Sequence, residues 1–537
     1  MLIRDRVTAS ALTGLARVTN HFGKDPEVKE ATRVPRPEEL TAAHWGNGNI
    51  RPLDPIGWFA HQQGVEKLQK SFYAIPENQR VRLAKKTSNL FRSRTKTTVP
   101  GLDVSGLSRV IAVDPEELTA DVQGMCTFED LVDTLLPFGC APYVVPELKT
   151  ITLGGAVTGM GVESSSFRNG LPHESVLEMD ILTGTGEVVT CSPEQNADLY
   201  RAFPNSYGSL GYAVRLKIKI EKVAPFVQLR HVRFDDFASI SAALAEISRS
   251  REFEGEAVDY LDGVVFSPSE AYLVLGRKSW DIPAHVSDYT GERIYYRSIQ
   301  HPSGVTRDCL TTHDYLWRWD TDWFWCSRAF GAQDPKIRRF WPKGLLRSSF
   351  YWKLIGLDKK YDIADRLNER KGQAPRERVV QDIEVTTQHL PEFLNWFFSS
   401  CDIQPVWLCP ILLAKSSEEL TSKGDVLLSP EAAAGGADVH PWPLYPLSNG
   451  DLWINVGFWS DVPADLLGVG APKGAFNREI EKKVDELGGH KSLYSEAFYS
   501  EEQFAALYGG EIPALVKKVY DPKGRFPSLF DKAVGGK

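Results

Sequence analysis

Residues 151–170 read ITLGGAVTGMGVESSSFRNG and include three consecutive serines and glycines at positions 154, 155, 159, 161 and 170. Glycine loses more conformational entropy on folding than any other residue, so this run indicates an unusual backbone or a close approach to another group. The pattern is neither the GxGxxG of a Rossmann fold nor a P-loop, which would end in Lys-Ser or Lys-Thr. We expect a loop whose N–H groups and serine hydroxyls face an anion; a plain glycine-rich turn is the alternative.

The composition is that of an ordinary globular protein. A chain of 537 residues exceeds what one hydrophobic core usually serves, so two or three domains are expected. The net charge of -8 gives no reason to expect a nucleic-acid partner. The seven cysteines have no CxxC spacing, so we expect no disulfide framework and no metal site.

Targeting signals are weak. The first 18 residues carry basic groups but no long apolar core, which argues against a signal peptide. No stretch approaches the roughly 20 apolar residues of a membrane span. We therefore expect a cytoplasmic protein.

Local patterns alternate short strands with helices between residues 81 and 220. Residues 107–124 indicate two strands joined by a turn, and residues 176–192 a hairpin. Residues 127–139 have apolar side chains at helical spacing behind Thr127, a candidate N-cap. Residues 58–72 and 476–489 indicate helices, and residues 212–223, 271–277 and 405–413 strands. The fold class predicted is α+β.

The order of motifs over residues 144–220 is more specific than any single motif. PELKTITLGG at residues 146–155, GVESSS at 161–166, GTGE at 184–187 and the run over 192–211 strongly resemble the FAD-binding domain of vanillyl-alcohol-oxidase-type flavoproteins. Within that superfamily the chain looks closest to the sterol Δ24-reductase (24-dehydrocholesterol reductase/Diminuto) family. The resemblance continues at residues 378–413 and 488–504 and covers roughly residues 60–510.

This resemblance implies an architecture. Two small subdomains clamp the FAD diphosphate, and an α+β cap domain covers the isoalloxazine. The domains expected are an N-terminal extension (1–75), the FAD-binding domain (76–224), a cap and substrate domain (225–460) and a C-terminal segment (461–537) that returns to the flavin site.

The resemblance also implies cofactor contacts. The first phosphate loop is expected at residues 85–94, and the full set of expected FAD contacts is Thr87, Ser88, Asn89, Arg94, Gly154, Gly155, Gly161, Glu163, Ser164, Ser165, Ser166, Gly208, Leu210 and His490. A solvated basic surface is the alternative for Arg92, Arg94 and Lys96. The RGGGHS-type loop of many oxidases is absent, together with the histidine that some relatives link to flavin, so we expect non-covalent FAD.

Candidate catalytic residues lie in two segments. Asp382 and Glu384 are two apart in the strand-like VVQDIEV, so they share one face, and burial would favour a protonated acid. His490 and Lys491 in GGHKSLY resemble polar groups beside the flavin pyrimidine, where a lysine would stabilise the anionic reduced ring. Tyr494 and His389 are further candidate acids. An exposed strand face and a solvated loop are the alternatives.

Aromatic residues crowd residues 313–330, HDYLWRWDTDWFWCSRAF. Core packing, a channel for a long apolar substrate and a surface that dips into lipid remain open as explanations.

The function predicted is NADPH-driven, FAD-dependent reduction of a carbon–carbon double bond in a lipid. The favoured substrate is the methylene group of a 10-methylene fatty acyl chain, which becomes a methyl branch of the tuberculostearic type. A methyltransferase partner subunit and a peripheral contact with the inner face of the membrane accompany this reading. The alternatives are a Δ24-sterol or isoprenoid alkene reductase, an oxygen-using alcohol oxidase of the same fold, and a lipid-binding scaffold without catalysis.

Overall fold

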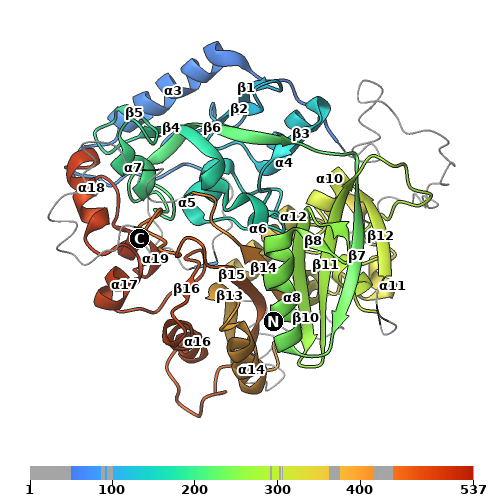
Figure 1. Cartoon of the computed structure of the whole chain (residues 1–537). Helices are drawn as coiled ribbons and strands as arrows, with labels where there is room; N and C mark the ends of the chain where they lie inside the picture. The colour runs from blue at the N-terminus through green and yellow to red at the C-terminus, as the bar shows by residue number, and fades with distance from the viewer. Residues whose placement is uncertain are drawn as a thin grey trace.

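The computed structural model describes residues 50–85, 91–92, 101–290, 293–301, 304, 306–361, 375–415, 420 and 440–535 (Figure 1). The expected FAD contacts Thr87, Ser88, Asn89 and Arg94 lie outside these residues.

The first half of the chain forms an antiparallel sheet of six strands in the order β1-β2-β6-β4-β5, with β3 paired to β6. The strands are β1 (Val110–Asp114), β2 (Thr119–Gln123), β3 (Cys140–Pro142), β4 (Val176–Leu182), β5 (Val188–Cys191) and β6 (Tyr212–Lys222). Helices α3 (Gly57–Tyr73) and α4 (Phe128–Leu135) pack on β1. The strands and helices predicted in this region are confirmed, including the N-cap, since Thr127 Oγ1 accepts the Asp130 N–H at 3.1 Å.

The glycine-rich stretch differs from the predicted loop. It forms helix α5 (Leu153–Gly159), whose N-cap Thr152 accepts the Gly155 N–H at 3.2 Å, and the short helix α6 (Ser166–Asn169). A Cβ on Gly154 would lie 2.6 Å from the carbonyl oxygen of Gly124, and one on Gly161 would lie 2.7 Å from Pro146 Cγ. Close packing of the chain on itself therefore requires at least these two glycines.

The second half forms an antiparallel sheet of eight strands in the order β12-β7-β11-β10-β14-β15-β13-β16. The strands are β7 (Phe226–Phe234), β10 (Tyr260–Ser267), β11 (Glu270–Ser279), β12 (Thr306–Thr311), β13 (Arg376–Thr386), β14 (Val406–Ile411), β15 (Trp453–Pro463) and β16 (His490–Lys491). The chain passes from β6 to β7 at residues 223–225, close to the boundary expected at 224.

The two faces of this sheet have different neighbours. Helices α8 (Phe237–Ser250), α14 (Leu390–Ser400) and α16 (Ala475–Glu486) cover one face, where Ile383, Val456 and Leu408 belong to a separate apolar core. The other side of the sheet is turned toward the first domain, the part of the protein built on the six-stranded sheet (Figure 1). The mixture of helices and antiparallel sheets confirms the α+β class.

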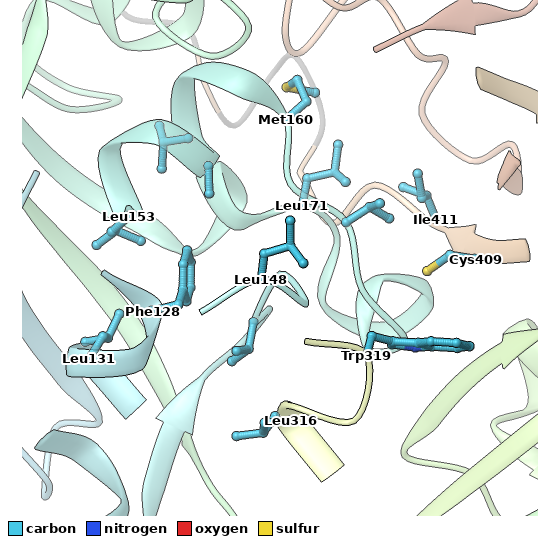
Figure 2. Close-up of a cluster of buried hydrophobic side chains, with 14 of the residues drawn as sticks. Phe128, Leu131, Leu148, Leu153, Met160, Leu171, Leu316, Trp319, Cys409 and Ile411 are labelled. Carbon is cyan, nitrogen blue, oxygen red and sulfur yellow. The ribbon is translucent and has the colours of Figure 1, made fainter. Parts of the chain in front are cut away.

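One apolar core joins the two halves. Figure 2 shows part of it: Leu153 and Phe128 of the first domain lie on one side, and Cys409 and Ile411 of β14 on the other. Leu148 lies between these groups. The first domain and the second sheet are therefore packed on each other without a polar layer at this point.

The aromatic segment is core. Trp317, Trp319, Trp323 and Trp325 are at most 3% exposed, so the idea that this segment dips into lipid is wrong. Buried polar bonds hold it in place: the Arg318 guanidinium lies 2.6 Å from Glu163 and 3.0 Å from Asp262. Such a band reaches the interior because each charge within it finds a partner.

The C-terminal helices α17 (Glu501–Leu507), α18 (Ile512–Tyr520) and α19 (Leu529–Ala533) return to the first domain, where α18 packs on α7 (Ala197–Ala202) (Figure 1). Backbone hydrogen bonds fix this return, from Val81 N–H to Arg525 at 2.9 Å and from Gly184 N–H to Tyr520 at 2.8 Å.

Candidate active site

A polar cluster lies on the sheet face that looks toward the first domain. Asp382 and Glu384 of β13 are opposite Gly457 and Asn455 of β15. Because directly opposed residues of antiparallel strands point to the same side, all four share this face. The prediction that the two carboxyl groups share one face is confirmed.

The Asp382 carboxyl lies over the backbone of β15. A Cβ on Gly457 would come within 2.6 Å of Asp382 Oδ1, so this position accepts only glycine without a shift. Asn455 is fully buried, faces Asp382 and has no other hydrogen-bond partner among the described residues.

Asp382 keeps some exposure and bonds to the C-terminal segment. Tyr494 donates to its carboxyl, and the Trp459 indole N–H in turn donates to the Tyr494 oxygen at 2.8 Å. Burial raises the pKa of Asp382 to about 7, although hydrogen bonds from Tyr494, Trp459 and Asn455 oppose that rise.

Glu384 is the more buried acid, at 2% exposure. The Tyr445 hydroxyl donates to one carboxyl oxygen, and the Ser492 hydroxyl lies 3.2 Å from the other. Burial raises the pKa of Glu384 to about 8, the bond from Tyr445 opposes the rise, and the negative charge of Asp382 adds to it. The pair therefore carries at least one proton near neutral pH.

The first domain supplies the opposite wall. The Arg92 guanidinium lies 4.6 Å from the centre of the Tyr207 ring and donates to the Leu493 carbonyl. The Phe91 N–H donates to the Tyr494 carbonyl at 2.9 Å. Burial raises the pKa of Tyr207, the Arg92 guanidinium opposes that rise, and the charges of Glu384 and Asp382 add to it. The Tyr207 hydroxyl donates to the Gly159 carbonyl at 3.0 Å.

The residues around the SYGSLG motif fit FAD. Asn205 Oδ1, Ser206 Oγ and Ser209 Oγ are fully buried and have no hydrogen-bond partner in the described part of the chain. Buried hydroxyls without partners are rare unless a ligand or water satisfies them. Lys517 and Lys532 lie beside the same loop, since they donate to the carbonyls of residues 209 and 207 at 3.0 and 3.1 Å. Lys517 also pairs with Asp521 at 2.5 Å. Buried alcohol and amide groups with lysine side chains beside them suit a ribose and a diphosphate.

Other expected cofactor contacts adjoin this loop or pack nearby. Gly208 has φ +74° and Leu210 is fully buried in the same loop. Gly155 lies in the first turn of α5, where its N–H is held by the N-cap. Their contact with FAD stays a prediction.

The serine run has protein partners. Glu163 pairs with Arg318, the Ser164 hydroxyl lies 2.9 Å from the Tyr315 hydroxyl, and Ser165 Oγ donates to the Tyr143 carbonyl at 2.8 Å. Ser166 Oγ accepts the backbone N–H of residue 163 at 3.1 Å. Glu163 and Ser164 therefore join the first domain to the aromatic segment, whereas Ser165 and Ser166 bond within the first domain. The buried hydroxyls without a partner among the described residues are those of residues 206 and 209.

His490 joins the cluster, opposite Glu384 on β16. Its ring lies 5.6 Å from that of Tyr445 and 5.9 Å from that of Trp453. Burial lowers the pKa of His490 to about 4, so the ring is neutral at physiological pH.

Lys491 and His389 are not brought to the acids. Lys491 is opposite Ile383, on the helix-covered face, where its fully buried ammonium lies 2.6 Å from Glu481. The predicted contact with the flavin pyrimidine is therefore wrong, because β-strand alternation turns Lys491 away from it. His389 is the N-cap residue of α14, with Nδ1 3.4 Å from Thr386 Oγ1.

Several residues of the cluster were not anticipated from the sequence: Tyr207, Tyr445, Asn455, Trp459 and Ser492. The sequence pattern could have predicted two of these residues. The alternation in WINVGFW over residues 453–459 places Asn455 and Trp459 on one face, and that pattern is as regular as the one that identified Asp382.

No group of three or more His, Cys, Asp or Glu side chains among the described residues is arranged to hold a metal ion. None of the helices described is both long and apolar enough to span a bilayer.

Comparison with known proteins now identifies the fold family. An FAD binding domain model matches residues 65–192. Delta(24)-sterol reductase from Mus musculus is 23% identical over 433 residues, covering 79% of this chain and 76% of the relative. The enzyme of that name from Arabidopsis thaliana is 23% identical over 463 residues, covering 81% and 77%. Cytokinin dehydrogenase 10 from Oryza sativa subsp. japonica is 30% identical over 197 residues, or 35% of each chain.

These matches confirm the predicted flavin-binding fold of the vanillyl-alcohol-oxidase type. Together with the unpartnered polar groups at residues 205–209, they identify the chain as an FAD-dependent oxidoreductase that is similar over most of its length to Δ24-sterol reductases.

Proposed function

We propose that this protein reduces an isolated carbon–carbon double bond in a lipid and draws its reducing equivalents from NADPH. The observation that carries the proposal is the Asp382–Glu384 pair. Two carboxyl groups with raised pKa values lie on the sheet face that looks toward the FAD-binding domain.

An isolated alkene has no carbonyl group to stabilise added negative charge. Reduction therefore needs a proton donor close to the alkene, and positive character develops at the more substituted carbon. When bound, FAD supplies the hydride chemistry. The chain supplies the proton, and Asp382 is the best donor because it keeps some exposure and is about half protonated at pH 7.

The neighbours of Asp382 prepare it for this role. Tyr494, itself held by Trp459, fixes the direction of the carboxyl. Glu384 keeps its proton to a higher pH, so it adds little negative charge to the site near neutrality. The neutral His490 ring leaves the cluster without a cation on this side.

The similarity to Δ24-sterol reductases supports a sterol or other isoprenoid alkene as substrate over the methylene fatty acyl chain. The methylene substrate, with its methyltransferase partner, remains the second candidate, since both alkenes form positive charge at a fully substituted carbon. For either substrate we propose a cytoplasmic enzyme that works at a lipid surface.

Anaerobic reduction of the FAD-loaded protein tests the proposal. NADPH should bleach the yellow protein, and either a Δ24-sterol or a methylene-stearoyl lipid should restore the colour. The lipid that restores it faster identifies the substrate class. Bleaching by an alcohol followed by rapid recolouring in oxygen would instead show an oxidase. A protein that takes up no FAD would show a scaffold.

A further inference from the structure

We propose that residues 335–347, PKIRRFWPKGLLR, dock on an anionic lipid bilayer, the source of the lipid substrate. The inference rests on the proposed function only in taking the substrate to be a lipid. We call these residues the basic loop.

The charge of the basic loop contrasts with that of the protein. Residues 335–347 include five Lys or Arg residues and no Asp or Glu, in a chain of net charge -8. Arg338 and Arg347 pair inward with Asp322 and Glu129. Lys336, Arg339 and Lys343 are exposed and give the loop its outward positive charge.

An exposed aromatic side chain lies among these cations. Phe340 is 60% exposed, and Lys343 is 65% exposed with its nearest carboxylate 3.9 Å away. An apolar ring flanked by ammonium and guanidinium groups matches the boundary between lipid headgroups and acyl chains. A soluble anion would use the charges but would leave Phe340 unexplained.

A row of aromatic rings leads from the loop to the active site. The Trp341 ring is 6.4 Å from Tyr351, which stacks on Trp323 at 6.2 Å. Trp323 stacks on Phe91 at 5.8 Å, and Phe91 lies 5.9 Å from Tyr494. The indole N–H groups of Trp323 and Trp341 have no hydrogen-bond partner in the described ranges, so they are unpaired donors within an otherwise apolar row. These rings belong to the buried core and connect the loop to the active site by direct packing.

Vesicle co-sedimentation tests the docking. The full-length, FAD-loaded protein should sediment with vesicles of 30% phosphatidylglycerol in phosphatidylcholine and remain in solution with phosphatidylcholine alone. The double variant Lys336→Glu/Lys343→Glu should weaken binding more than twentyfold, because each basic residue at an anionic surface contributes roughly fivefold. Phe340→Ala should weaken binding about tenfold, and 0.5 M salt should release the wild-type protein.

Matched controls lie elsewhere on the surface. Lys482→Glu on α16 and Phe59→Ala on α3 alter residues that are 68% and 79% exposed and should sediment as wild type does. Equal binding to both kinds of vesicle, or wild-type binding by the double variant, would overturn the proposal. Loss of NADPH affinity without loss of vesicle binding would mark the loop as a dinucleotide site instead. Reduction of a detergent-dispersed alkene should be unchanged in Phe340→Ala, so docking and catalysis can fail independently.

Discussion

The Trp459 indole N–H donates a 2.8 Å hydrogen bond to the Tyr494 hydroxyl, joining β15 to the C-terminal segment. Because that hydroxyl already accepts from Trp459, its own proton points to Asp382. The direction of this bond makes Tyr494 a donor to the carboxyl group and leaves the proton of Asp382 available on its other side.

Asp382→Asn should lower the rate at which an alkene recolours the reduced protein by about 10²–10⁴-fold, the usual contribution of a general acid. Reduction by NADPH should stay within about twofold, since that step uses no proton from Asp382. Stopped-flow absorbance measures both steps, with the exposed Asp281→Asn as control. Wild-type recolouring in the Asp382 variant would remove this residue from the reaction.

The recolouring rate should fall above about pH 7, because the pKa of Asp382 is raised to about 7 and only its protonated form donates. Tyr494→Phe should move the midpoint upward by about one pH unit. The hydrogen bond from Tyr494 stabilises the carboxylate, so its loss raises the pKa further. A midpoint that stays fixed in this variant would mean that another group controls the profile.

Stability should decline between pH 5 and pH 8. The folded pKa values of Asp382 and Glu384, about 7 and 8, lie above their ordinary values of 3.8 and 4.5. The folded state therefore holds more protons than the unfolded state in this window, and each group lowers the free energy of unfolding by up to about 1.4 kcal/mol per pH unit.

Glu384→Gln should flatten this decline, since one of the two groups no longer ionises. Thermal unfolding from pH 5 to pH 8 measures the slope, with the exposed Glu117→Gln as control. Equal slopes in the Glu384 variant and the wild type would show that the carboxyl is ionised in the folded protein.

Lys491→Met should cost about 3–5 kcal/mol of stability, because it leaves the Glu481 carboxylate buried without its partner. Adding Glu481→Leu should restore most of the loss. Denaturant unfolding measures both variants, and Lys482→Met on the exposed side of α16 is the control. A stable single variant with a lowered flavin potential would return Lys491 to the flavin.

FAD should be released by acid precipitation and colour the supernatant, because residues 85–94 contain no His or Cys to form a covalent link. Ser206→Ala/Ser209→Ala should weaken FAD binding about tenfold or more, at roughly 1 kcal/mol for each lost hydrogen bond. Fluorescence titration measures the affinity, and the exposed Ser269→Ala is the control. A yellow pellet would contradict non-covalent binding.

Local patterns in the sequence predicted the parts of the fold that depend on near neighbours. Strand alternation identified β13 and the shared face of Asp382 and Glu384, and the N-cap at Thr127 fixed the start of α4. The ordered motifs at residues 146–211 predicted the flavin domain. These signals depend on periodicity and on short turns, which a single sequence records directly.

Local sequence patterns could not predict which distant segments pair with each other. The face to which Lys491 turns depends on the register of β16 against β13, two strands separated by about a hundred residues. The partner of Glu384, Tyr445, belongs to neither strand. The glycine-rich stretch was mistaken for a loop because the packing that requires Gly154 involves Gly124, which lies outside the motif.

The position of β16 at the end of its sheet has a consequence for biosynthesis. Seven strands of that sheet leave the ribosome before residues 490–494, and until those residues emerge β13 is an edge strand with its two acids uncovered. The C-terminal residues Tyr520 and Arg525 then accept hydrogen bonds from Gly184 and Val81, which belong to the part of the chain that is synthesised earlier. A nascent chain stalled before this point would hold most of its secondary structure, yet Asp382 and Glu384 would lack the hydrogen bonds from Tyr494 and Ser492.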